Sequence, residues 1–219
     1  MKREKKVGIE TEAVLEEAGK LGLVLDGDQA GKLAAYLELL EKWNRLTNLV
    51  GPREWRAMFA TLVVDSIHLA GFLEGLALPE APRCLDLGAG AGLPGIPLRV
   101  LWERGEYHLV EVREKRITFL RLALGTLKLP GTFVFGGRAE DAAQKLGPAD
   151  LVLSRAFMPW TELLPLARPM LAPGGRVAIL ANEPAPELPE TWRLEAQREY
   201  DVAGKSRYFW SVLPASSSM

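Results

Sequence analysis

The feature that most constrains this chain is a glycine-rich turn that directly follows a short apolar run. Residues 84–87 read Cys-Leu-Asp-Leu, and glycine then occupies every second position of 88–92. Glycine adopts positive φ without strain and carries no Cβ, so such a turn is tight and lets a ligand approach the backbone closely. Pro94 and Pro97 suit the first turn of a helix, where a missing N–H costs little. A strand end, a bare turn and a helix start therefore meet at the point where open α/β sheets bind cofactors.

Beyond this turn, strand-like apolar runs alternate with helical stretches. The expected strands are 84–87, 107–111, 132–135, 151–154 and 176–180. The expected helices between them are 96–104, 114–128, 138–145 and 161–171. This alternation predicts parallel strands with helices on both faces and right-handed crossovers. Strand-like stretches at 192–200 and 207–213 flank a turn and predict an antiparallel hairpin, so the fold class is α/β with a Rossmann-like, mostly parallel seven-stranded sheet.

The first part of the chain reads as helices that need a partner surface. Residues 28–45 place Leu33, Leu37 and Leu40 at helical spacing opposite charged positions, an amphipathic pattern. We therefore expect a helical extension over 1–75, packed on a core domain over 76–219. Asp65 interrupts an otherwise apolar helix face, and burying it without a partner would be costly. We expect it to support the glycine turn or to contact a ligand.

Composition excludes several classes of protein. One cysteine and two histidines permit no internal disulfide and leave no ligand set for a structural zinc site. The charged start of the chain lacks the apolar core of a signal peptide, and no uninterrupted apolar run reaches membrane-spanning length. We expect a soluble, cytoplasmic monomer that needs no metal and no membrane. The formal net charge of -1 means that any nucleic-acid binding must rest on a local basic patch.

Two cofactor interpretations compete for the glycine turn. Residues 90–95 fit the dinucleotide pattern G-x-G-x-x-G, with Glu111 about 20 residues further on, which would indicate a nicotinamide-dependent oxidoreductase. Residues 88–92 instead read G-x-G-x-G directly after the strand. A pyrophosphate needs an open helix N-terminus, and here Pro94 and Pro97 crowd that terminus without offering an N–H. S-adenosylmethionine, an adenosine ligand without phosphate, has no such need.

Three further features favour S-adenosylmethionine. Glu111 ends the second expected strand, where its carboxylate can accept hydrogen bonds from both ribose hydroxyls. The turn 171–175 and the terminal hairpin are both typical of methyltransferases of this fold. We therefore predict a class I S-adenosylmethionine-dependent methyltransferase. Its cofactor should lie against the turn and this acid, at Asp86, Gly88, Ala89, Gly90 and Glu111.

The sequence excludes some of the atoms that such an enzyme could methylate. Methylation of carbon 5 of a pyrimidine needs an attacking cysteine, and Cys84 lies within a strand. Enzymes that methylate exocyclic amino groups commonly carry Asn/Asp-Pro-Pro-Tyr/Phe after the fourth strand, where this chain has Ser-Arg-Ala-Phe at 154–157. A ring nitrogen with a lone pair, such as guanine N7, needs no base, and positioning suffices. The sequence is compatible with such an acceptor but does not identify it.

Residues 85–98 resemble the signature of the bacterial ribosomal small subunit methyltransferase G family, formerly known as glucose-inhibited division protein B. The Leu-Pro-Gly-Ile-Pro ending is its most specific part. Further matches lie at 42–44, 48–49, 65–66, 115–116, 138–140, 154–157 and Arg207. The resemblance implies methyl transfer from S-adenosylmethionine to N7 of one guanine in small-subunit (16S) ribosomal RNA. It implies cofactor contacts at Gly88, Leu93, Ala139, Glu140 and Arg155.

One position departs from the family pattern, and several residues are candidates for RNA contact. The family pattern has Lys-Gly after the fifth strand, where this chain has Ala181-Asn182. Basic residues follow the second strand, and phosphate contacts from such residues make RNA binding salt-sensitive. The residues expected at the RNA, either free or in a 30S subunit or precursor, are Asn48, Asp65, Arg113, Lys115, Arg116 and Arg207.

Arg155 is the residue expected to act in the reaction. It lies at the carboxyl end of the fourth strand, where a cation can hold the methionine carboxylate or an RNA phosphate. Its expected role is positioning, since no general base is needed. A third interpretation remains besides the two enzymes: a non-catalytic RNA-binding or ribosome assembly factor that retained the fold.

Overall fold

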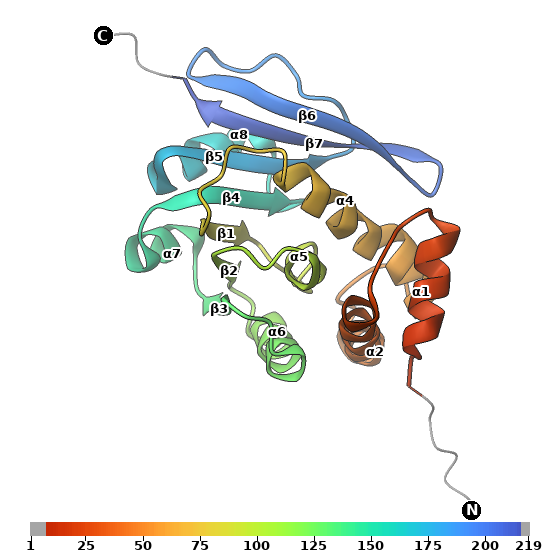
Figure 1. The fold of residues 1–219 in the computed structure, drawn as a ribbon. Coiled ribbons are helices and arrows are strands. Elements are labelled where there is room, and N and C mark those ends of the chain that lie inside the picture. The colour runs from red at the N-terminus through yellow and green to blue at the C-terminus, as the bar shows by residue number, and fades with distance from the viewer. Residues whose placement is uncertain (1–7, 216–219) are drawn as a thin grey trace, which may run out of the picture.

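The computed structural model describes residues 8–215, in which one seven-stranded sheet lies between two layers of helices (Figure 1). The strands are β1 Arg83–Leu87, β2 Glu106–Glu111, β3 Thr132–Gly136, β4 Ala149–Arg155, β5 Leu171–Ala181, β6 Trp192–Val202 and β7 Lys205–Pro214. Their order is β3-β2-β1-β4-β5-β7-β6. The first five pair in parallel, and β7 runs antiparallel to both β5 and β6. The predicted α/β fold class and the terminal hairpin are confirmed.

The helices cover the two faces of this sheet. They are α1 Thr11–Lys20, α2 Gly27–Thr47, α3 Trp55–Met58, α4 Val64–Leu73, α5 Gly95–Leu101, α6 Glu114–Leu127, α7 Ala139–Leu146 and α8 Trp160–Ala167. Successive strand residues point to opposite faces, and each face has its own core. Cys84, Leu151 and Leu153 pack with α2, α4, α5 and α6. Leu85 and Val152 pack with α7 and α8, so the parallel strands are buried on both sides.

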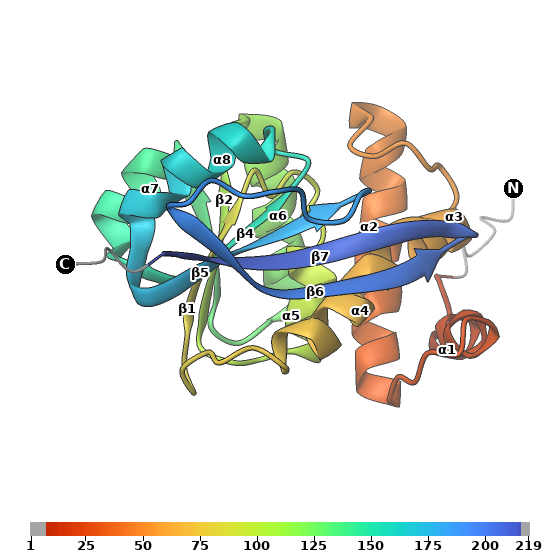
Figure 2. The same cartoon turned by 90° about the horizontal axis from the view of Figure 1, so that it is seen from above.

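The N-terminal helices belong to the first of these cores. Helix α2 contacts α5 and α6, and α4 contacts α5. Tyr36 and Trp43 of α2 meet Phe119 of α6, with ring centroids 6.4 and 5.7 Å apart. The β6–β7 hairpin extends beyond the parallel strands on the side of these helices (Figures 1 and 2). The boundary between an extension over 1–75 and a core domain over 76–219 stays a prediction.

Three expected elements differ from the structure by three residues or more at one end, whereas the others agree to within two residues at each end. The helix expected over 96–104 ends at Leu101, because the carbonyls of Trp102 and Arg104 turn toward the buried Arg99. The helix expected over 161–171 ends at Ala167 and continues as a 3₁₀ turn, Arg168–Met170. Strand β5 begins at Leu171 rather than at Arg176, since Leu171 already pairs with Ala149 across an irregularity in the register.

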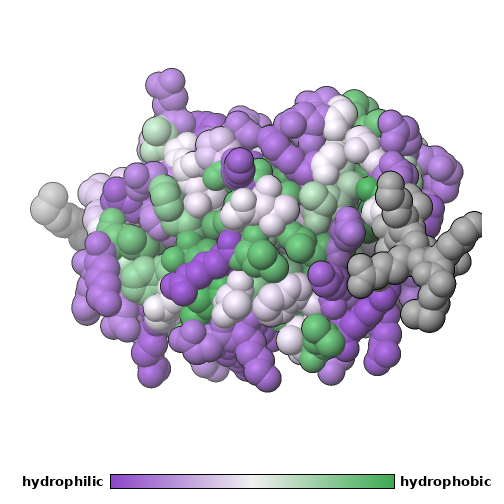
Figure 3. Space-filling view, turned by 90° about the horizontal axis from the view of Figure 1, so that it is seen from below, coloured by the Kyte–Doolittle hydropathy of each residue, from purple (hydrophilic) through white to green (hydrophobic). Residues whose placement is uncertain are grey.

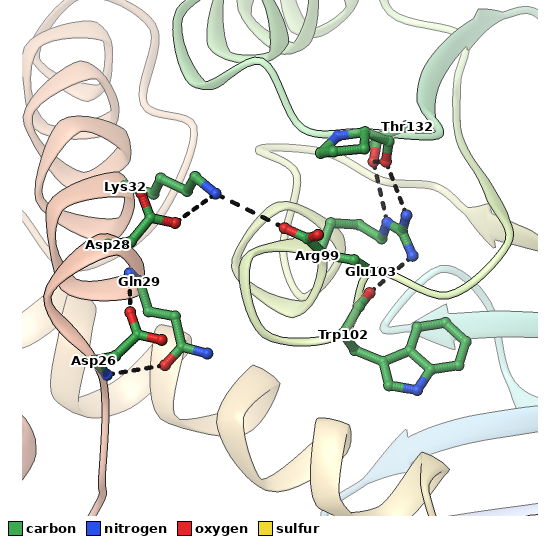
Figure 4. Close-up of polar contacts among 9 residues, drawn as sticks. Asp26, Asp28, Gln29, Lys32, Arg99, Trp102, Glu103 and Thr132 are labelled. Carbon is green, nitrogen blue, oxygen red and sulfur yellow. Dashed lines mark hydrogen bonds and ion pairs between the residues drawn. The ribbon is translucent and has the colours of Figure 1, made fainter.

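Arg99 organises the side of the molecule where α5 meets the sheet (Figure 4). Its side chain is fully buried. It donates to Thr132 Oγ1 at 3.1 Å and to the carbonyls of Trp102 and Pro130, each at 2.8 Å. Lys32 of α2 lies between Asp28 at 2.7 Å and Glu103 at 3.7 Å. These contacts fix α2 and α5 against each other and hold the helix that follows the glycine turn.

A π turn, Phe59–Val63, joins α3 to α4. Within residues 8–215, one segment, Trp55–Leu73, is long and apolar enough to cross a membrane, and half of that window is buried inside the protein. It packs as a core helix, so it gives no support for a membrane span. π turns are frequent at functional sites, and this one directly precedes the buried Asp65.

The face on the side of α6 mixes a central hydrophobic area with a hydrophilic border (Figure 3). Among the exposed large apolar side chains, Leu122 belongs to α6 and Phe133 to the edge strand β3. Neither of them lines the cavities found at the glycine turn. The polar site described next is therefore separate from these apolar side chains.

Candidate functional site

The glycine turn follows β1, as its sequence pattern predicts. Gly88, Gly90 and Gly92 have φ of 70°, 60° and 79°, a region that other residues enter only with strain. The backbone N–H groups of Gly88 and Ala89 both donate to the Val110 carbonyl at 3.0 Å. A Cβ on Gly88 would collide with the ring of Phe157. The turn therefore begins at Gly88 and exposes bare backbone.

Glu111 ties this turn to the end of β2. Its Oε2 accepts from Gly90 N at 3.0 Å, and its Oε1 accepts from Val112 N at 2.8 Å and Arg113 N at 2.9 Å. Arg116 Nη1 lies 3.5 Å from Oε2. The side chain is buried, and these donors fix its orientation. The Glu111 carboxylate is therefore held in one orientation beside the turn.

Two adjoining cavities, which we call the cofactor cleft, lie along the turn. The first, of about 350 Å³, is lined by Glu111, Val112, Ala139 and Phe157. The second, of about 300 Å³, is lined by the turn from Gly88 to Leu93 and by a loop from the N-terminal helices, Leu49 to Gly51. Both cavities share Gly88, Arg116 and Ala156. The cleft is thus one elongated site that spans the ends of β1, β2 and β4.

Most of the expected cofactor contacts line this cleft, but two do not. Gly88, Ala89, Gly90, Leu93, Glu111, Ala139 and Arg155 line it. Asp86 points behind the turn, where it accepts from Tyr107 Oη at 3.1 Å, and burial raises its pKa to about 7. The side chain of Glu140 lines a separate groove with α8, because it follows Ala139 by one residue on the helix. The side chains of Asp86 and Glu140 therefore lie near the cleft but do not form its wall.

The expected RNA residues fall into two groups, one at each end of the cleft. Asn48, Arg113, Lys115 and Arg116 line one surface cavity of about 320 Å³. Asp65 and Arg207 line another, together with Arg155. Arg113, Arg116 and Arg155 also line the cofactor cleft. The structure therefore brings together, around a single edge of the sheet, side chains that come from both halves of the chain.

Asp65 is the centre of the second group. Its Oδ2 accepts from Arg207 Nη1 at 2.8 Å and lies 3.5 Å from Arg155 Nη2, while Tyr200 Oη donates to Oδ1 at 3.1 Å. Burial raises the pKa of Asp65, and the two guanidinium groups and Tyr200 oppose that shift. The carboxylate is thus buried with three donors around it, as an acid on this helix face requires.

Several residues of the site are not among the site residues expected from the sequence. Asn44 is buried in the last turn of α2, donates to the Pro52 carbonyl at 2.8 Å and accepts from Val50 N at 2.8 Å. It thereby fastens the loop that covers the glycine turn. Tyr200 and Val112 also line the site, and they are not among the candidates named from the sequence. The family match at 42–44 is the available signal for Asn44, while nothing local marks Tyr200. Residues 8–215 contain no cluster of side chains suited to a metal ion.

Comparisons with known proteins show which family this sequence resembles. The sequence model of the family "rRNA small subunit methyltransferase G" matches residues 29–205. A protein named ribosomal RNA small subunit methyltransferase G from Nitratidesulfovibrio vulgaris is 58% identical over 183 residues, covering 83% of this chain and 84% of that protein. One of the same name from Oleidesulfovibrio alaskensis is 48% identical over 204 residues, covering 88% and 89%.

Solved structures share the fold at low sequence identity. A crystal structure of MtNAS in complex with S-adenosylmethionine has a TM-score of 0.60 and 15% identity, covering 94% of this chain and 78% of that one. The ribosomal protein L11 methylase from Lactobacillus delbrueckii has a TM-score of 0.52 and 11% identity, covering 76% and 81%. These likenesses concern the fold alone.

Proposed function

The chain belongs to the rRNA small subunit methyltransferase G family, and on that basis we propose that it methylates N7 of a guanine in 16S ribosomal RNA. It is an S-adenosylmethionine-dependent methyltransferase with an α/β fold. The observation that carries the proposal is the match to this family over residues 29–205, and the contact between the bare turn and the acid that ends β2, Gly90 N to Glu111 Oε2 at 3.0 Å, supports its cofactor part. No observation favours a nicotinamide-dependent oxidoreductase or a non-catalytic assembly factor.

The cleft suits S-adenosylmethionine from end to end. Glu111 would hold the ribose, with Val112 and Ala139 on the adenine side. The turn and the loop from Leu49 to Gly51 would enclose the methionine side. The bound cofactor supplies an electrophilic methyl group on a sulfonium. The protein's own contribution is to orient that methyl and to exclude water, since a guanine N7 lone pair requires no proton removal.

RNA would approach along the two groups of residues that flank the cleft. Arg113 and Lys115 are exposed beside Asn48, and such residues suit the phosphates of the RNA backbone. Because the formal net charge of the protein is only -1, the electrostatic attraction to RNA would come from this local basic patch. We propose that the protein acts in the cytoplasm as a monomer on small-subunit RNA, a precursor particle or the 30S subunit.

A methyl transfer assay tests the proposed function. The protein is incubated with S-adenosylmethionine carrying a tritiated methyl group and with small-subunit RNA or subunits from a strain that lacks the enzyme. We expect label on one guanine, released by chemical cleavage specific for N7-methylguanine. Label found only on protein, or on an exocyclic amino group, would contradict the proposal. Parallel titrations with S-adenosylmethionine and NADH should show binding of the first alone.

A further inference from the structure

A third cavity, of about 270 Å³, lies beside the cofactor cleft at the carboxyl ends of β4 and β5. We call it the β4–β5 cavity. Its wall includes Arg155, Ala156, Asn182, Tyr200 and Arg207. Helix α4 contributes Asp65 to its base, and the β6–β7 hairpin contributes Tyr200 and Arg207. Elements that are distant in sequence thus converge on one pocket next to the cleft.

Ala156 connects this cavity with the cofactor cleft. It lies in the wall of the β4–β5 cavity and of both parts of the cleft. Its φ of 51° is left-handed, a conformation that non-glycine residues adopt rarely and that is enriched at active sites. The two parts of the cleft meet at Gly88, Arg116 and Ala156, and of these three Ala156 also lines the β4–β5 cavity. A cofactor whose sulfonium lay where the two parts meet would therefore carry its methyl group next to the β4–β5 cavity.

Two cationic groups in the wall of the cavity, Arg155 and Arg207, are hydrogen-bond donors, and the carboxylate there, Asp65, is already occupied. Both oxygens of Asp65 are engaged, by Arg207 at 2.8 Å and by Tyr200 at 3.1 Å, with Arg155 Nη2 at 3.5 Å. The side chain of Asp65 is 1% exposed. Arg155 Nη1 is buried and has no hydrogen-bond partner among residues 8–215. A buried cationic donor without a partner is costly and indicates an acceptor that a ligand supplies.

We propose that the β4–β5 cavity receives the acceptor guanine and that Arg155 selects it by donating from Nη1 to O6. This inference rests on the proposed function. Guanine carries acceptors at both N7 and O6, whereas adenine carries an amino donor in place of O6. Arg155 therefore accepts guanine and opposes adenine. Asp65 is a positioning residue, because its Oδ2 lies 3.5 Å from Arg155 Nη2, and Arg207 and Tyr200 in turn hold the carboxylate of Asp65.

The reaction in this arrangement needs no proton transfer. The N7 lone pair forms the new bond to carbon while the bond from that carbon to sulfur breaks, and the electron pair of that bond stays on sulfur. The positive charge moves from the sulfonium to the purine, and S-adenosylhomocysteine leaves. O6 lies next to N7 on the purine, so a donor at O6 fixes the angle at which N7 meets the methyl group.

The test uses RNA in which the methylated guanosine, once mapped, is replaced by analogues. Inosine keeps O6 and N7, and we expect it to be methylated at nearly the rate of guanosine. 2-Aminopurine keeps N7 but lacks O6, and we expect a roughly 5- to 150-fold lower kcat/KM. In the variant Arg155→Met this preference should disappear, and it should do so whether or not affinity for S-adenosylmethionine falls, because Arg155 also lines the cofactor cleft. Arg193→Met, an exposed arginine on β6, is the matched control and should keep the preference.

Three results would overturn the inference. One is equal methylation of guanosine and 2-aminopurine by the unaltered protein. Another is loss of activity on inosine. The third is weaker cofactor binding by Arg155→Met with its base preference intact, which would place Arg155 on the methionine carboxylate. Tyr200→Phe removes only one hydroxyl. We expect this variant to lose part of the preference for guanosine over 2-aminopurine while it remains folded, as a thermal unfolding curve would show. If the unaltered protein fails on guanosine RNA, the proposed function fails instead.

Discussion

Glu111 shows how a single side chain joins the sequence pattern to the chemistry. Its two oxygens accept three backbone N–H groups, so the carboxylate is already oriented before any ribose hydroxyl arrives. This contact is predictable, because an acid at the end of the second strand and glycines at the end of the first must meet at one sheet edge. The direction of the Asp86 side chain is not predicted correctly. Because side chains alternate along β1, it points toward Tyr107 instead of into the cleft.

Glu111→Gln tests this role in cofactor binding. The amide keeps the size of the side chain but turns an –NH₂ group toward backbone donors and loses the charge-assisted bond to ribose. We expect affinity for S-adenosylmethionine to fall roughly 10- to 100-fold. Titration calorimetry measures it. Glu114→Gln, in the first turn of α6, is the control and should bind the cofactor normally, and equal binding by both variants would refute the assignment of Glu111.

Asp86 predicts a pH dependence of folding stability. Burial raises its pKa from 3.8 to about 7, so between these values the folded chain keeps a proton that the unfolded chain releases. Stability is therefore fully present at the acid end and falls as pH rises toward 7. In Asp86→Asn this loss is absent, and its stability relative to the unaltered protein should grow by at most about 4 kcal/mol across that window. Urea unfolding at several pH values measures both proteins, and parallel curves would contradict the expectation.

Among the elements, the regular strands and helices follow from apolar runs and periodicity, whereas their interruptions do not. No sequence pattern marks the π turn at Phe59–Val63, and the early end of α5 at Leu101 depends on the buried Arg99, whose partners Pro130 and Thr132 lie elsewhere in the chain. The cluster around Asp65 has the same origin. Arg207 lies 142 positions from Asp65 in the sequence, and only the docking of the β6–β7 hairpin on α4 brings them together. The sequence marks both residues as candidates but does not pair them.

The loop between α2 and α3 gives a prediction at this scale. Asn44 fastens it by two hydrogen bonds of 2.8 Å, to Pro52 O and from Val50 N. Asn44→Ala leaves both backbone groups without this partner, and we expect the KM for S-adenosylmethionine to rise about 10-fold, for a cost of roughly 1–3 kcal/mol. Asn44→Asp keeps the acceptor alone and should give a smaller rise. A KM that stays the same in both variants would show that the loop does not cover the cofactor.

At the scale of the whole molecule, we propose that a nearly neutral protein uses a local basic surface to bind a polyanion. Lys115 is exposed beside Asn48 and does not line the cofactor cleft, so it should act on RNA affinity without affecting cofactor affinity. We expect Lys115→Gln to weaken RNA binding and to lower the slope of log affinity against log salt by about 1. Filter binding over a salt series measures this. Lys128→Gln, just beyond the C-terminus of α6, is the control, and an unaltered slope in Lys115→Gln would exclude this side chain from the RNA interface.

Mass mapping of small-subunit ribosomal RNA, from matched cells with and without this protein, tests the central claim most directly. The claim is that the edge of the sheet around the turn at 88–92 and Glu111 carries one methyl group to one ring nitrogen of one base. The predicted result is a single guanine that gains one methyl group, at N7, only when the protein is present. Identical maps, or a new methyl group on an amino nitrogen or on a pyrimidine, would contradict it.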